Sequence, residues 1–536
     1  MRNKPYPLYE LPLITDLKDM LLKRLKSSPD SNAFSFSQGK EVITKTTNEF
    51  ANDINSLGTF LLSKGHKRHH IAIIGENSYE WIVSFMAIVN GGNIAVPVDK
   101  EYSAAEISQL IQKSDCNAVI VSKGYSDLVE NIGLPIYGMG DFSAFLSEGQ
   151  TLIENGNREF VDYEIRPEQL AAIFFTSGTT GSSKGVMLSH KNMAADINFA
   201  CKNFVLEGDT LAVLPFHHTF GLITAIFKVF HYGKCTHINK SLKRIKQDIA
   251  IAKPQTIFMV PLFVETFYKQ IIETAKNSGQ LSKLERGVKI SDLLLKLGID
   301  IRRKLFGTVL NAFGGNLEYI ICGGAPLDVK YVKAFRSWGV SILNGYGITE
   351  CSPVVSVNRN HYWRDGSVGQ VLNGSDVIIA DDGEVIVKGD NVMLGYYKDE
   401  QATSEVLKDG RYHTGDLGKI DDDGFLFLTG RKKNLIILSN GENVSPEEIE
   451  ARILRYDTVC ETVVYEDGGQ IVAEIFPTEE HIGDRAHFDS LIKQVNEGQP
   501  KFKQVNTVRL RDSEFPKNTT KKIIRYKVKE EQSNDR

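Results

Sequence analysis

The residues from Thr176 to Gly185, TSGTTGSSKG, are the densest group of side chains in this sequence that could take part in chemistry. Hydroxyls and glycines surround one lysine, Lys184. Such a loop suits phosphate oxygens, because backbone N–H groups and hydroxyls donate hydrogen bonds and the lysine supplies positive charge. It is not a Walker loop, which needs glycine where Ser183 stands, Ser or Thr where Gly185 stands, and a helix behind it. The flanks predict strand, loop, strand, and a plain turn is the alternative interpretation.

A second group, NGYGITE from Asn344 to Glu350, combines an aromatic ring, a hydroxyl and a carboxylate. An aromatic face can stack on a purine base, while the other two groups can reach phosphate and Mg²⁺. Asp416, at the end of YHTGD, could accept hydrogen bonds from ribose hydroxyls. The simpler interpretations are a glycine turn with a solvated glutamate, and a surface ion pair for Asp416 or for Arg431.

Histidines and cysteines offer weaker patterns. His217 and His218 are neighbours of equal chemistry, and both could simply pack in a pocket wall. The segment HYGKCTH holds potential zinc ligands, but its spacing matches no structural zinc site. The cysteines lie far apart without a CxxC pair, which predicts free thiols in a reducing compartment. They are Cys116, Cys201, Cys235, Cys322, Cys351 and Cys460.

Composition is that of an ordinary folded protein: 536 residues, of which 42% are hydrophobic, 24% charged and 9% aromatic. The 63 basic and 67 acidic residues give a net charge of −4, so no overall positive field attracts nucleic acid. The N-terminus lacks the apolar run of a secretory signal, and Asn, Gly and Pro interrupt the uncharged stretch from Trp81 to Val98. We expect a cytoplasmic protein with no transmembrane span and no nucleic-acid partner.

The elements that position these groups alternate between strand and helix from His70 to Ser122. This alternation predicts an α/β fold with parallel, doubly wound sheets. Asn77 is expected to cap the first helix, with Glu80 completing a capping box. A second pass of the same kind is expected from Thr210 onward.

The texture changes after Ser367, where short strands separated by Gly and Asp predict a β-rich subdomain. Asp382-Gly383 and Asp423-Gly424 are expected to be hairpin turns, because this dipeptide tolerates the positive φ of tight primed turns.

Another module starts beyond Gly430, with a helix for which Ser445 is the expected N-cap and Glu448 the returning cap. We therefore predict an N-terminal domain of layered sheets over residues 1–430, a hinge at 431–434 and a small α+β domain at 435–536.

With these motifs in this order, the sequence resembles the adenylate-forming superfamily, which includes acyl-CoA synthetases, firefly luciferase and the adenylation domains of peptide synthetases. TSGTTGSSKG is similar to the superfamily's phosphate loop. The other matching blocks are LPFHHTFG (Leu214 to Gly221), CGGAPL (Cys322 to Leu327), NGYGITE (Asn344 to Glu350), YHTGD to SPEEIE (Tyr412 to Glu450) and PKNTTKKIIR (Pro516 to Arg525).

The resemblance implies roles for the residues in these blocks. Tyr346 would stack on adenine, Thr349 would contact the α-phosphate and Glu350 would bind Mg²⁺. Asp416, helped by Arg431, would bind the ribose. The implied nucleotide-binding residues are Thr176, Ser177, Gly178, Thr179, Thr180, Lys184, Gly323, Gly324, Ala325, Tyr346, Gly347, Asp416 and Arg431.

Other implied roles concern the acid and the second half-reaction. His218 would line the carboxylate pocket, an assignment that the resemblance alone makes in preference to His217. Lys433 would be the hinge of a mobile C-terminal domain, and Gly441 would let a pantetheine arm approach closely, because it has no side chain. Lys522 would stabilise the negative charge that builds up as the carboxylate meets the α-phosphate. The commoner form has glycine before this lysine, and Lys521 stands there, so either lysine could enter the site.

The activity implied is that of an AMP-forming acid–thiol ligase with ATP, Mg²⁺ and coenzyme A. A carboxylic acid and ATP would give an acyl-adenylate and pyrophosphate, and the acyl group would then pass to coenzyme A with release of AMP. The chain is most like the long-chain fatty acyl-CoA synthetases, which implies a medium- or long-chain fatty acid and makes peripheral contact with a membrane plausible. The alternatives are transfer to the phosphopantetheine of an acyl carrier protein, and a catalytically silent nucleotide-binding protein.

Overall fold

The computed structural model describes residues 7–176, 183–438, 442–517 and 523–534. They form two compact units. The large unit comprises Met1–Asp376 and Val387–Tyr412, and the small unit comprises Val377–Ile386 and His413–Arg536. The expected hinge at 431–434 lies within the long segment of the small unit, and the domain boundaries that the sequence suggests stay predictions.

A seven-stranded sheet in the large unit confirms the alternation expected after His70. Strands β3, β4, β5, β6 and β7 are parallel to their neighbours within this set, while β8 is antiparallel to β7. Its apolar strands are buried on both faces, as parallel strands covered by helices are. The spatial order is β18 (Gly395–Tyr396), β8 (Lys184–Ser189), β7 (Leu170–Thr176), β4 (Ile94–Val98), β3 (His70–Ile74), β5 (Cys116–Val121) and β6 (Ile136–Gly138).

A nine-stranded sheet in the same unit is the second pass that the sequence predicts from Thr210. Its central strands are parallel, and Ile257, Ile320 and Leu343 on three of them belong to one buried core. The spatial order is β15 (Gln370–Val371), β14 (Val354–Val357), β13 (Ser341–Gly347), β12 (Tyr319–Cys322), β11 (Thr256–Met259), β9 (Thr210–Ala212), β10 (Thr236–Ile238), β1 (Asn32–Gln38) and β2 (Glu41–Thr46).

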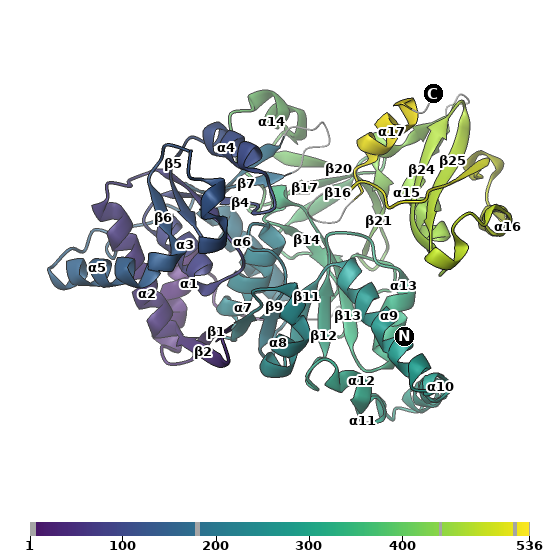
Figure 1. Cartoon of the computed structure of the whole chain (residues 1–536), viewed down its shortest axis with the longest axis horizontal. Helices are drawn as coiled ribbons and strands as arrows, with labels where there is room; N and C mark the ends of the chain where they lie inside the picture. The colour runs from purple at the N-terminus through teal and green to yellow at the C-terminus, as the bar shows by residue number, and fades with distance from the viewer. Residues whose placement is uncertain (1–6, 177–182, 439–441, 518–522, 535–536) are drawn as a thin grey trace. The chain divides into compact units, whose positions relative to one another are not determined.

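The helices of the large unit vary widely in burial, and α9 to α12 lie next to one another in sequence order (Figure 1). A π-helical segment, Phe220–Phe227, follows β9 and continues into α7. The α-helices are α1 (Leu17–Ser27), α2 (Thr47–Ser63), α3 (Tyr79–Asn90), α4 (Ala104–Lys113), α5 (Phe142–Glu154), α6 (His190–Asn203), α7 (Lys228–His231), α8 (Ile245–Ala252), α9 (Pro261–Asn277), α10 (Leu281–Lys296), α11 (Arg302–Leu305), α12 (Gly307–Asn311), α13 (Val329–Ser337) and α14 (Glu400–Val406).

The expected cap of α3 is wrong by one residue. Ser78 is the N-cap, and its hydroxyl accepts a hydrogen bond from the Trp81 N–H at 3.2 Å. The Asn77 amide instead donates to the Leu214 carbonyl at 2.8 Å and accepts from the Phe216 N–H at 3.1 Å. Asn77 therefore holds a loop that follows β9 rather than starting the helix.

The β-rich segment expected after Ser367 is also present. It contains a five-stranded sheet in which Asp382-Gly383 and Asp423-Gly424 lie between paired strands. Gly383 (φ 85°) and Gly424 (φ 80°) have positive φ, whereas their aspartates do not. The hairpins are therefore wider turns with one left-handed glycine, not the primed turns that the sequence suggested. The strands are β16 (Asp376–Ile379), β17 (Glu384–Lys388), β19 (Leu407–Lys408), β20 (Arg411–Ile420) and β21 (Leu426–Arg431).

The small unit has its own core, in which Val464, Ile475 and Phe488 are buried. Ser445 precedes α15 as predicted, but its hydroxyl donates to the Thr429 carbonyl at 2.7 Å instead of capping the helix, and Glu448 pairs with Lys503. The capping box expected there is therefore wrong. The elements are β22 (Ile436–Ile437), β23 (Asn443–Val444), β24 (Val459–Asp467), β25 (Gln470–Pro477), β26 (Thr507–Leu510), α15 (Pro446–Ile453), α16 (Arg485–Asn496) and α17 (Arg525–Asn534) (Figure 1).

Candidate active site

The motif residues of the large unit follow the carboxyl ends of parallel strands. In the nine-stranded sheet, Gly323 follows β12 directly, Thr349 and Glu350 follow β13, and the two adjacent histidines follow β9. In the seven-stranded sheet, β7 ends at Thr176. Neighbouring parallel strands end at the same edge, and this edge is where ligands bind in open α/β sheets. The structure therefore gathers motifs that lie far apart in the sequence.

The phosphate-loop segment joins two antiparallel strands, as the sequence predicts. Thr176 at the end of β7 is the register partner of Lys184 at the start of β8. Because no helix follows this loop, a Walker-type site is excluded by the fold as well as by the motif. Ser177, Gly178, Thr179 and Thr180 lie outside the described residues, and so do Gly441, Lys521 and Lys522.

Lys184 and Glu350 both contact one tyrosine, Tyr396, the first at its ring and the second at its hydroxyl. The Lys184 ammonium lies 4.8 Å from the centroid of the Tyr396 ring. The Tyr396 hydroxyl donates a hydrogen bond to Glu350 Oε1 at 2.8 Å. Burial, reinforced by the negative charge of Glu350, raises the pKa of Tyr396, so the phenol stays a hydrogen-bond donor at neutral pH.

Tyr396 was not among the residues that the sequence pointed to. It lies on β18, the edge strand paired with β8, and it is 5% exposed. Its neighbour Tyr397 has the same chemistry, but that hydroxyl bonds Asp115 at an exposed position. No local signal separates the two tyrosines, because the contact with Glu350 exists only in the folded sheet.

Backbone geometry fixes the segment that carries Thr349 and Glu350. These residues form the 3₁₀ turn Thr349–Cys351, and the Glu350 carbonyl accepts from the Met393 N–H at 2.8 Å. Gly347 packs against Pro353 so closely that a β-carbon there would lie 2.4 Å from the Pro353 carbonyl oxygen. Glycine at position 347 therefore meets a packing requirement, whatever its contact with a nucleotide.

The remaining nucleotide-binding candidates of the large unit lie on β13 or in the loop that follows β12. Tyr346 is on β13 and is 8% exposed. The Gly323 N–H donates to the Met259 carbonyl at 3.3 Å. Gly324 has a φ of +86°, in the left-handed region that favours glycine, and Ala325 beside it is exposed. Their contacts with adenine and phosphate stay predictions.

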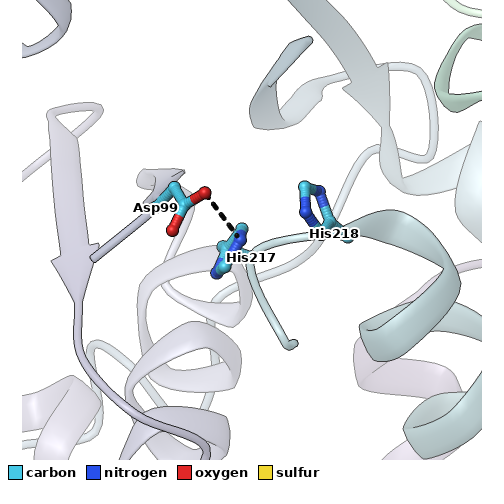
Figure 2. Close-up of side chains that lie close together, drawn as sticks. All are labelled: Asp99, His217 and His218. Atoms are coloured by element: carbon cyan, nitrogen blue, oxygen red, sulfur yellow. Dashed lines mark ion pairs between the residues drawn. The ribbon is translucent and has the colours of Figure 1, made fainter. Parts of the chain in front are cut away.

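His217 and His218 lie beside a buried carboxylate, Asp99, that the sequence did not point to (Figure 2). Asp99 follows β4, and its Oδ2 lies 3.5 Å from His217 Nε2. The His217 and His218 ring centroids are 4.2 Å apart. The contact joins the carboxyl-end loops of two different sheets, so these loops form one continuous region. The histidine that pairs with Asp99 is His217. The resemblance instead assigned the acid pocket to His218.

Asp416 and Arg431 meet in the small unit, as adjacent residues of β20 and β21. Arg431 Nε lies 2.7 Å from Asp416 Oδ1, and Asp416 is 4% exposed. The pair therefore presents a carboxylate that a guanidinium holds in place. Lys433 lies two residues after Arg431. Partial burial, together with repulsion from Arg431, lowers the pKa of Lys433 to about 8.

Magnesium is the metal that the motifs imply, and the residues present fit it. Glu350 and Thr349 offer the carboxylate and hydroxyl oxygens that this hard cation prefers. The adjacent lysine, Lys184, suits the phosphate groups that Mg²⁺ accompanies.

Two family models match the chain: that of the AMP-binding enzymes over residues 21–397, and that of the AMP-binding enzyme C-terminal domain over residues 433–534. A long-chain-fatty-acid–CoA ligase of Mycobacterium bovis is 28% identical over 80% of this chain and 76% of its own length. Long-chain-fatty-acid–CoA ligase 5 of Rattus norvegicus is 30% identical over 76% of this chain and 67% of its own.

Solved structures agree on the fold. The anthranilate CoA ligase AuaEII in complex with anthranoyl-AMP has a TM-score of 0.78 at 20% identity, covering 97% of this chain and 98% of that one. The o-succinylbenzoate CoA synthetase of Bacillus subtilis with its acyl-adenylate has a TM-score of 0.75 at 22% identity, covering 95% and 97%. The chain therefore belongs to the AMP-binding enzymes of the adenylate-forming superfamily, which confirms the family and the AMP-forming ligase type that the sequence motifs predict.

Proposed function

We propose that this enzyme joins a medium- or long-chain fatty acid to coenzyme A through an acyl-adenylate. The observation that carries the proposal is the convergence of Lys184, Tyr396 and Glu350 where the strands of two sheets end. Two anions, a carboxylate and a triphosphate, must meet for the first step. Fixed positive charge and hydrogen-bond donors lower that barrier because they are in place before the reaction starts.

Each described residue has a defined task in this proposal. Lys184 neutralises the outgoing phosphates, and Thr349 donates its hydroxyl to the α-phosphate. Tyr396 orients the Glu350 carboxylate, which holds Mg²⁺, and the metal supplies further charge neutralisation when bound. The acid carboxylate then attacks the α-phosphorus, the bond to the bridging oxygen breaks, and pyrophosphate leaves with that oxygen.

The small unit supplies the other groups in our proposal. Asp416, held by Arg431, binds the ribose hydroxyls. Lys522 reaches the α-phosphate during adenylation, and Lys521 is the competing candidate. Lys433 is the hinge between two arrangements of the C-terminal domain, and Gly441 lines the path of the pantetheine arm in the second one.

The fatty acid is the substrate class that the curated relatives support, since those named above are long-chain-fatty-acid–CoA ligases. A carrier-protein phosphopantetheine is the alternative acceptor. The experiment is ATP–pyrophosphate exchange with acids of graded chain length, followed by thioester formation with free coenzyme A or with a phosphopantetheinylated carrier protein. If none of the acids in the series supports ATP–pyrophosphate exchange, the proposal is contradicted and a silent nucleotide-binding protein is favoured. Thioester on the carrier protein alone would replace coenzyme A as the acceptor.

We also propose that the acid arrives from an anionic membrane surface that contacts α10. No helix among the described residues is long and apolar enough to cross a bilayer. On the outer face of α10 and its end, however, Ile290, Leu293 and Leu297 are 55%, 62% and 70% exposed at helical spacing. The same helix carries more basic than acidic residues, which complements anionic headgroups. The basic residues are Lys283, Arg286, Lys289 and Lys296, against the acidic Glu285 and Asp292.

A further inference from the structure

We propose that Asp99, His217 and His218 form a binding site for a divalent transition metal such as Zn²⁺, separate from the Mg²⁺ assigned to Glu350. One ligand atom from each side chain lies within 4.8 Å of those of the other two. The closest pair, Asp99 Oδ2 and His217 Nε2, is 3.5 Å apart (Figure 2). Two ligands of one tetrahedral zinc ion, each about 2 Å from the metal, are separated by about 3.3 Å. Asp99 and His217 are therefore already spaced as zinc ligands, and His218, within 4.8 Å of both, completes the site by moving closer.

The donor set selects the kind of metal. Two imidazoles and one carboxylate bind Zn²⁺ and similar first-row ions, whereas Mg²⁺ prefers oxygen ligands alone. Three protein ligands leave an open coordination position, as in catalytic zinc sites. Among the described residues, this is the one group of three such side chains close enough to share an ion.

Asp99 and the loop that carries His217 are held in place before any metal arrives. Asp99 Oδ1 accepts a hydrogen bond from the Glu101 N–H at 3.0 Å, so Oδ2 faces His217. The loop before His217 is pinned by Asn77 through the two hydrogen bonds described above. Ligands fixed in this way lose little conformational freedom when they bind, which favours affinity.

Burial gives the site a further reason to bind a cation. The side chains of Asp99 and His217 are 5% and 9% exposed. A carboxylate removed from water is costly unless positive charge compensates it. A divalent ion bound between Asp99 and His217 provides this compensation.

The consequence for catalysis rests on the proposed function. If His218 lines the acid pocket, a metal bound there occupies space that the acid carboxylate needs. Zn²⁺ would then inhibit adenylation in competition with the acid. Metal binding itself does not depend on the reaction, so a direct binding measurement separates failure of the metal site from failure of the proposed function.

The test is titration of the full, chelator-treated chain with Zn²⁺ by calorimetry in the presence of excess Mg²⁺, and with Co²⁺ by its visible absorption. We expect one zinc per chain in the wild type. Asp99→Asn and His218→Ala should each weaken the affinity at least tenfold, since loss of even a supporting residue typically costs about 10- to 100-fold. Circular dichroism checks that the variants fold. His218→Asn is used in place of His218→Ala if that variant does not fold.

The matched control is His481→Ala. His481 and His487 form another pair of neighbouring imidazoles, with ring centroids 4.8 Å apart, but they belong to no such group with a carboxylate. This variant should retain the wild-type affinity. The proposal is overturned if the wild type binds no stoichiometric zinc, if Asp99→Asn and His218→Ala bind as tightly as the wild type, or if His481→Ala weakens binding equally.

Discussion

Tyr396 contacts both Lys184, which we propose binds phosphate, and Glu350, which we propose binds Mg²⁺, and this link can be tested by removing a single oxygen atom. Tyr396→Phe deletes the donor to Glu350 Oε1 and leaves the ring beneath Lys184. A hydrogen bond to a charged group contributes about 1.5–3 kcal/mol, so we expect adenylation to fall about 10- to 100-fold. In Glu350→Gln the rate of adenylation should fall further, and a higher Mg²⁺ concentration should be needed to reach its maximum. ATP–pyrophosphate exchange across a range of Mg²⁺ concentrations measures both effects.

The adjacent residue provides the control. Tyr397→Phe also removes a phenol that donates to a carboxylate, Asp115, but that pair is exposed. We expect its exchange rate to match the wild type. Equal losses in Tyr396→Phe and Tyr397→Phe would show that general damage to β18, and not the contact with Glu350, lowers the rate.

At this scale the sequence identified residues whose chemistry stands in a local motif and missed those whose role comes from a distant contact. Lys184, Thr349 and Glu350 stand in motifs with distinctive neighbours. Asp99 and Tyr396 do not, because their partners His217 and Glu350 lie far away along the chain. A lone carboxylate after an apolar strand looks like any other strand end until the second sheet brings a histidine to it.

Secondary structure was predictable where burial decides it and less so where one polar contact does. The residues of β3, β4 and β5 are nearly all apolar and buried, so the strands were correctly predicted from the sequence. The start of α3 offered two capping residues in succession, Asn77 and Ser78. Asn77 is taken up by the loop around Leu214, and that contact decides between them. Such a choice cannot be read from one segment alone.

The exposed face of α10 makes a prediction about membranes. Leu293→Glu combined with Leu297→Glu places negative charge among the apolar side chains that we propose contact an anionic surface. We expect at least a tenfold loss of binding to phosphatidylglycerol vesicles in a sedimentation assay, because burial of apolar area and electrostatic attraction are both removed.

Leu13→Glu is the control for this experiment, since Leu13 is 57% exposed but lies far from α10 in the sequence. It should sediment like the wild type. If the wild type does not bind vesicles but forms dimers that Leu293→Glu disrupts, the apolar face is an interface between two copies, and the membrane proposal fails.

For the molecule as a whole, buried histidines predict acid sensitivity. Burial lowers the pKa of His190 to about 4, and burial lowers that of His231 to about 4 as well. The unfolded chain takes up a proton near pH 6.5, whereas the folded chain does so only near 4. Between these values the unfolded state binds more protons, so stability is complete above pH 6.5 and decreases as pH falls towards 4.

His190 alone corresponds to about 3 kcal/mol over this range at most. The melting temperature should therefore fall from pH 6.5 to pH 4, and His190→Gln should flatten this dependence even if it melts lower throughout. His361→Gln, at an exposed position, should keep the wild-type slope. A slope that His190→Gln leaves unchanged would assign the acid sensitivity to other groups.

The two half-reactions place different demands on the small unit, and substitutions there can separate them. Lys522→Ala should strongly impair adenylation, because the cation that we propose offsets the meeting of carboxylate and α-phosphate is then missing. The variant should still form thioester from a supplied acyl-adenylate. Lys433→Pro restricts the backbone at the proposed hinge and should slow thioester formation more than adenylation. Single-turnover assays of each step measure both. Equal losses in the two steps with Lys433→Pro would remove the hinge from position 433, and loss of adenylation in Lys521→Ala but not in Lys522→Ala would give the catalytic role to Lys521.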